Sequence, residues 1–111
     1  MQKFMVLYMA PARVIAKWMQ KPESERKEAD TKMRADWDAW MKEHSSLIKE
    51  TSAAGKTKRV SASGVTDVAN DIMLYSIVEG ESPEAVAEVF ASHPHLGIPE
   101  ATIEVMSVRS M

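Results

Sequence analysis

Two stretches of the chain are apolar at nearly every position. The first runs from Phe4 to Met9 and the second from Ile72 to Val78. Successive side chains of a strand point to opposite faces of a sheet, so an unbroken apolar run is tolerated only where both faces are covered. The pattern therefore predicts two central β-strands.

Three other stretches follow the three-and-four spacing of amphipathic helices. A short helix is expected after Pro11, and a long one after Pro22 whose apolar stripe runs from Met33 to Ile48. A third helix is expected to begin at Ser82-Pro83, where an N-cap residue precedes a proline, and to end near Ser92.

Two weaker strand patterns complete the chain. Lys56 to Ser61 predicts a polar edge strand, and Thr102 to Val108 alternates polar and apolar positions. The order β, α, β, β, α, β predicts an α+β, ferredoxin-like fold, a four-stranded antiparallel sheet with its helices on one face. A length of 111 residues fits a single domain spanning residues 1–111.

This arrangement has a consequence for assembly. The two central strands are apolar on both faces, but the helices can cover only one face. Soluble monomers rarely expose an apolar patch of that size. We therefore expect a homodimer that forms through the open sheet face.

Composition excludes several classes of function. A net charge of -2 and a pI near 5.9 give no reason to expect nucleic acid or a membrane surface as partner. With no cysteine, the chain has no disulfide, thiol nucleophile or thiolate metal site. The apolar N-terminal run is too short to span a membrane or to form a convincing signal peptide, so we expect a cytoplasmic protein.

The histidines near the end of the third helix are the first candidates for chemistry. His93 and His95 flank Pro94, where an imidazole can cap helix carbonyls or act as a general acid or base. Capping is the more ordinary role. A metal site would need a third ligand such as Asp67, and nothing in the spacing shows convergence, so we expect neither a metal nor a cofactor.

Two carboxylates are the next candidates. Asp71 begins the second central strand and Glu104 lies within the last one. A carboxylate on a covered face is costly unless it is paired or functional. Glu104 would serve as a base if it faced a helix-side cleft, or would pair with Lys58 or Arg59 of a second copy if it faced the dimer seam.

Aromatic side chains are candidates for ligand binding. Tyr8 and Tyr75 carry hydroxyls on the central strands, and Trp40 lies on the stripe of the long helix. Such rings are first of all core material, although rings beside a cleft also bind flat apolar molecules.

The chain resembles the YCII-related domains, including their DGPF-motif branch. The resemblance lies in the strands Lys3 to Tyr8, Tyr75 to Val78 and Ile103 to Val105, and in the turn His93-Pro94-His95-Leu96. It implies a dimeric α+β barrel with a cleft between sheet and helices. It also implies a poorly defined function: some relatives have a His/Asp pair at an active site, one dehalogenates hydrolytically, and others have no assigned role.

The sequence departs from that family at two places. Thr66-Asp67 stands where the Asp-Gly-Pro-Phe motif would begin, but Val68 follows and the named motif is absent. The first half of the long helix has no histidine, so the His/Asp pair of the hydrolytic relatives has no counterpart here.

Three functions are compatible with these observations. The first is a small-molecule-binding domain or hydrolase/lyase-type enzyme that uses a sheet-helix cleft, with His93 or His95 as acid/base. The second is a non-catalytic dimeric interaction or regulatory module. The third, an oxygenase-like barrel without a cofactor, rests on fold type alone.

Overall fold

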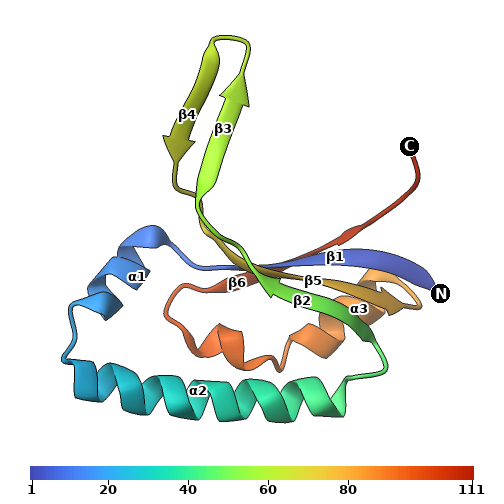
Figure 1. Ribbon diagram of the computed structural model, residues 1–111. Coiled ribbons are helices and arrows are strands. Elements are labelled where there is room, and N and C mark those ends of the chain that lie inside the picture. Colours follow the sequence, from blue (N-terminus) through green and yellow to red (C-terminus); the bar gives the residue numbers. More distant parts are fainter.

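The fold is a four-stranded antiparallel sheet with helices on one side and a separate hairpin on the other (Figure 1). The computed structural model describes residues 1–111. The main sheet has the order β2-β5-β1-β6, and β3 and β4 form a two-stranded sheet of their own. The strands are β1 (Gln2–Met9), β2 (Ile48–Ala53), β3 (Thr57–Ser61), β4 (Gly64–Val68), β5 (Ile72–Gly80) and β6 (Thr102–Ser107). The helices are α1 (Ala12–Met19), α2 (Glu23–Glu43), α3 (Pro83–Phe90) and the 3-10 turn η1 (Pro94–Gly97).

The prediction of an α+β fold with β1 and β5 at its centre is confirmed. These strands pair antiparallel, with Phe4 opposite Val78 and Met5 opposite Ile77. Phe4, Val6 and Tyr8 are fully buried on the helix side. The intervening residues of β1 point to the other face, as the period of two requires.

The prediction that Lys56 to Ser61 forms an edge strand of the main sheet is wrong. The edge is β2, and β3 pairs only with β4. The long helix also ends at Glu43, because Leu47 and Ile48 leave the helical stripe to lie beside β5. The hairpin turn is completed by Gly64, whose φ of 135° is a conformation that other residues rarely adopt.

The helix α3 approaches β5 closely at one point. A Cβ at Gly80 would collide with the side chain of Val86, which is 1% exposed. Because a buried valine is stiff at χ1, that side chain has little freedom to move aside. Glycine at this position therefore allows α3 to lie against the end of the strand.

The other face of the main sheet has no helix over it (Figure 1). Met5 and Leu7 of β1 lie there beside Ile77, Tyr75 and Met106 of the neighbouring strands. We call this surface the open face. It is the sheet face that the sequence predicted to remain uncovered by helices. No helix of the protein combines the length and the apolar character needed to cross a membrane.

Candidate functional site

The His93-Pro94-His95 turn ties the end of α3 to the end of β1. The backbone N–H of His95 donates to Nδ1 of His93 at 2.9 Å, and Nε2 of His95 donates to the carbonyl oxygen of Met9 at 2.9 Å. Pro94 starts the 3-10 turn between them. Both imidazoles are buried, at 2% and 1% exposed.

Aromatic rings from three elements surround His93. The centroid of its ring lies 4.3 Å from that of Trp37, 4.4 Å from that of Trp40 and 5.1 Å from that of Tyr8. Phe90 stacks at 5.9 Å. We call this group the aromatic–histidine cluster; it comprises Tyr8, Trp37, Trp40, Phe90, His93 and His95.

Burial keeps the histidines of the cluster neutral. It lowers the pKa of His93 to about 4, and repulsion from His95 and then from His44 acts in the same direction. Burial also lowers the pKa of His95, although hydrogen bonds with the backbone of Met9 and Thr102 oppose the change. Near neutral pH both rings are therefore uncharged.

One nitrogen of the cluster is left without a partner. Because Nδ1 of His93 accepts a hydrogen bond, the proton of the neutral ring is assigned to Nε2. That Nε2 is buried and has no hydrogen-bond partner. A buried polar atom of this kind is uncommon and calls for a physical explanation. In this cluster His93 is a hydrogen-bond donor with no acceptor.

A chain of hydroxyls runs across the helix side of the sheet beside the cluster. The oxygen atoms of Tyr8 and Ser76 are 2.8 Å apart, and those of Ser76 and Thr51 are 2.7 Å apart. Burial raises the pKa of Tyr8, and the hydrogen bond with Ser76 partly offsets this effect. The tyrosine therefore stays protonated, and its hydroxyl depends on Ser76.

Removing the two ends of this hydrogen bond should have unequal effects. Ser76→Ala strands a buried tyrosine hydroxyl and should lower the free energy of unfolding by about 1–3 kcal/mol. Tyr8→Phe leaves Ser76 paired with Thr51 and should lower it by about 1 kcal/mol. In the Tyr8→Phe background, Ser76→Ala should cost clearly less than it does alone. Urea unfolding of the four proteins measures this coupling, and additive effects would show that the hydroxyls act independently.

The structure brings together four of the residues singled out in the sequence: Tyr8, Trp40, His93 and His95. The other three lie elsewhere. Asp71 is exposed before β5, Glu104 is exposed on the open face opposite Leu7, and Tyr75 on the same face donates to a carboxylate oxygen of Glu50 at 2.6 Å. None of these three belongs to the cluster.

Ser76, Trp37 and Phe90 also belong to this region, and the sequence did not mark them as functional. The sequence could have indicated Ser76, because it is the one serine or threonine in the run from Ile72 to Val78, whose other residues are aliphatic or aromatic. Trp37 and Phe90 followed helical stripes like ordinary core residues. No group of three or more His, Cys, Asp and Glu side chains lies close enough to hold a metal ion.

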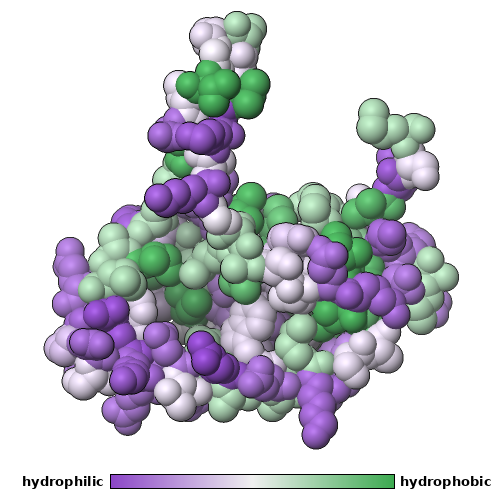
Figure 2. All heavy atoms as spheres, viewed as in Figure 1, coloured by the Kyte–Doolittle hydropathy of each residue, from purple (hydrophilic) through white to green (hydrophobic).

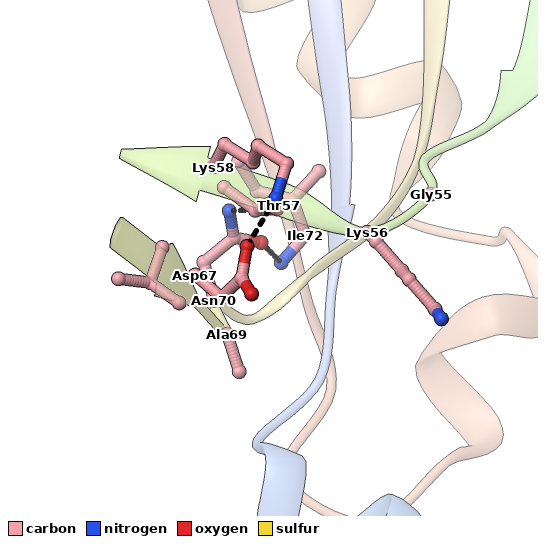
Figure 3. Close-up of a pocket in the computed structure, with 9 residues that line it drawn as sticks. Gly55, Lys56, Thr57, Lys58, Asp67, Ala69, Asn70 and Ile72 are labelled. Atoms are coloured by element: carbon pink, nitrogen blue, oxygen red, sulfur yellow. Dashed lines mark hydrogen bonds and ion pairs between the residues drawn. The ribbon is translucent and has the colours of Figure 1, made fainter. Parts of the chain in front are cut away.

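One hollow borders the cluster, and a second lies away from it. A shallow apolar depression of about 110 Å³ lies between α3 and β6, and Phe90 and Leu96 help to line it. An open cavity of about 650 Å³ lies at the foot of the β3–β4 hairpin. Figure 3 shows Lys58 and Asp67 joined by an ion pair in this second cavity, with Lys56 pointing away from them.

Comparison with solved structures identifies a similar fold. The 5-chloro-2-hydroxyhydroquinone dehydrochlorinase of Burkholderia phenoliruptrix AC1100, solved with 2,5-dihydroxybenzoquinone, matches with a TM-score of 0.57 and 12% sequence identity. The match covers 100% of this chain and 96% of that one. The likeness is one of fold. No family model and no curated protein matches the sequence.

Proposed function

We propose that the protein is a binding domain for a small, flat, oxygenated aromatic molecule, held in the aromatic–histidine cluster. The observation that carries this proposal is the buried Nε2–H of His93, which has no acceptor among the protein's own groups. A carbonyl or phenolate oxygen of a ligand would supply the acceptor. The rings of Trp37 and Trp40 would contact its flat faces.

The solved relative in fold supports the ligand class without establishing it. Its structure contains 2,5-dihydroxybenzoquinone, a flat molecule whose oxygen atoms accept hydrogen bonds. The cluster of this chain has the corresponding chemistry of aromatic surfaces and a fixed donor. Phe90 of the cluster also lines the depression between α3 and β6, so rotation of that ring would open a path from the surface.

The donor also indicates what chemistry the cluster would support. A hydrogen bond from His93 to a carbonyl oxygen would stabilise negative charge developing there, as a lyase-type reaction requires. The cluster contains no carboxylate, and both ring nitrogens of His93 already have assigned roles. We therefore propose His93 as the group that donates to the ligand, rather than as the base.

Calorimetric titration with 2,5-dihydroxybenzoquinone tests this proposal. Wild-type protein should bind it, and His93→Phe, which keeps a ring but removes the donor, should bind about tenfold more weakly. Trp18→Phe is the matched control, because Trp18 lies on α1, which has no buried residue. Equal affinity of the His93→Phe variant would remove His93 from the site.

A non-catalytic dimeric module is the second candidate. It is favoured by the tight packing of the cluster, in which Tyr8 is 0% exposed and His95 is 1% exposed. In that case His93 Nε2–H would be compensated only by weak contacts with the neighbouring rings. Failure of the quinone and of simple phenols to bind at millimolar concentration would favour this second function.

We further propose that the domain works as a homodimer formed through the open face. The apolar side chains of that face are only half-covered within one chain, as Met5, Leu7 and Ile77 illustrate. A second copy packed sheet to sheet would cover them. Sedimentation velocity should show a dimer at micromolar concentration, and a stable monomer would contradict the proposal.

A further inference from the structure

We infer that the β3–β4 hairpin is an arm that grips the second copy of the chain, an inference that rests on the proposed homodimer. The hairpin belongs to no other sheet and rises from the side of the molecule that bears the open face (Figure 1). A two-stranded hairpin alone is marginally stable in water. This one therefore lacks a packing surface within its own chain.

The tip of the arm is apolar and exposed. Val60 and Val65 lie directly opposite each other in the hairpin, and they are 78% and 62% exposed. Figure 2 shows a band of hydrophobic atoms near the tip of the hairpin, with hydrophilic side chains below it. A cross-strand valine pair stabilises a hairpin most when a further surface covers it. The pair is thus the natural contact of the arm with another molecule.

Charge identifies the other molecule as a second copy. Lys56 and Arg59 of the arm form no ion pair within the chain, whereas Lys58 is bound to Asp67. On the open face two carboxylates, those of Glu50 and Glu104, form no ion pair, against one lysine, Lys3. One chain therefore carries both a basic arm and an apolar face with an excess of unpaired carboxylates, which are complementary in charge.

The cavity at the foot of the arm would receive part of the second copy. It separates the arm from the start of β5, and Lys56 and Lys58 help to line it. An arm that crosses the open face of a second copy leaves such a space between itself and its own body. The edge of the second copy would enter it, with a carboxylate toward Lys56, because Lys58 is already paired with Asp67.

Sedimentation velocity of arm variants tests the inference. In the Val60→Asp/Val65→Asp variant the dimer dissociation constant should rise by at least about tenfold, because charge replaces the apolar tip. Leu96→Asp is the control, since Leu96 is also an exposed apolar residue (41%) but lies on the helix side. It should leave the dissociation constant unchanged.

A second variant tests the charge component independently of the apolar tip. Lys56→Glu/Arg59→Glu should also weaken the dimer by at least about tenfold at low salt, and by much less at high salt, where charges are screened. A wild-type dimer whose dissociation constant is unaltered by both arm variants would overturn the arm and leave the sheet-face dimer standing. A wild-type monomer would overturn both.

Discussion

Lowering the pH from about 7 to about 4 should reduce the free energy of unfolding by about 3 kcal/mol through His93 alone. The folded protein holds the pKa of this histidine at about 4, compared with 6.5 for an ordinary histidine. Between those values the unfolded chain binds a proton that the folded chain does not. Stability therefore rises with pH across this window and is lost as the pH falls.

Urea unfolding at a series of pH values measures this effect, with His93→Asn as the comparison. The asparagine carbonyl can still accept from the N–H of His95, but the side chain does not titrate. Its stability should be lower overall and vary much less between about pH 4 and pH 6.5. Because burial also lowers the pKa of His95, a double variant at His93 and His95 should be flatter still. An unchanged slope in His93→Asn would show that the proton is taken up elsewhere.

Trp40→Ala should lower the free energy of unfolding by about 3–5 kcal/mol. The indole is 6% exposed, lies 4.9 Å from Phe90 and 4.4 Å from His93 between ring centroids, and donates through Nε1 to the hydroxyl of Ser92 at 3.3 Å. Its removal would leave a cavity that the neighbouring rings cannot fill. The same change would admit water to His93, so the dependence of stability on pH should also become weaker.

Trp18→Ala provides the comparison for this experiment. It removes the same side chain from α1, where the indole is only half-buried. Its effect should be below about 1 kcal/mol. If both substitutions lowered the free energy of unfolding equally, the packing of Trp40 in the cluster would contribute no more to stability than the packing of Trp18 on α1. Trp40→Phe should fall between the two, because a smaller ring remains but the hydrogen bond to Ser92 does not.

The central part of the fold was predictable because its signal is local. The runs that became β1 and β5 are apolar at nearly every position, which is typical of central strands, and the Ser82 cap of α3 follows a short-range rule that the structure confirms. The edge strand β2 was not predictable in the same way. Leu47 and Ile48 continue a helical spacing, but Leu47 lies in the turn after α2 and Ile48 begins a strand that pairs with Val78 of β5.

The candidate site was predictable residue by residue but not as a group. Tyr8 and His95 are separated by most of the chain, and only the folded sheet brings them together. Alternation along β6 separated Glu104 from Ile103 and Val105, but it could not tell which set would face the helices. The structure places Ile103 and Val105 against the core and Glu104 on the open face.

The hydrogen bond from the N–H of His95 to Nδ1 of His93 limits which molecules could occupy the proposed site. Because Nδ1 accepts this bond, only Nε2 can donate to a ligand. Burial lowers the pKa of His93, so the ring stays neutral near pH 7. Among aromatic compounds of equal shape, the site would then favour those that arrive already ionised or carrying a carbonyl group. Which aromatic molecules bind would then depend on the pKa of the ligand, because His93 does not change its protonation state.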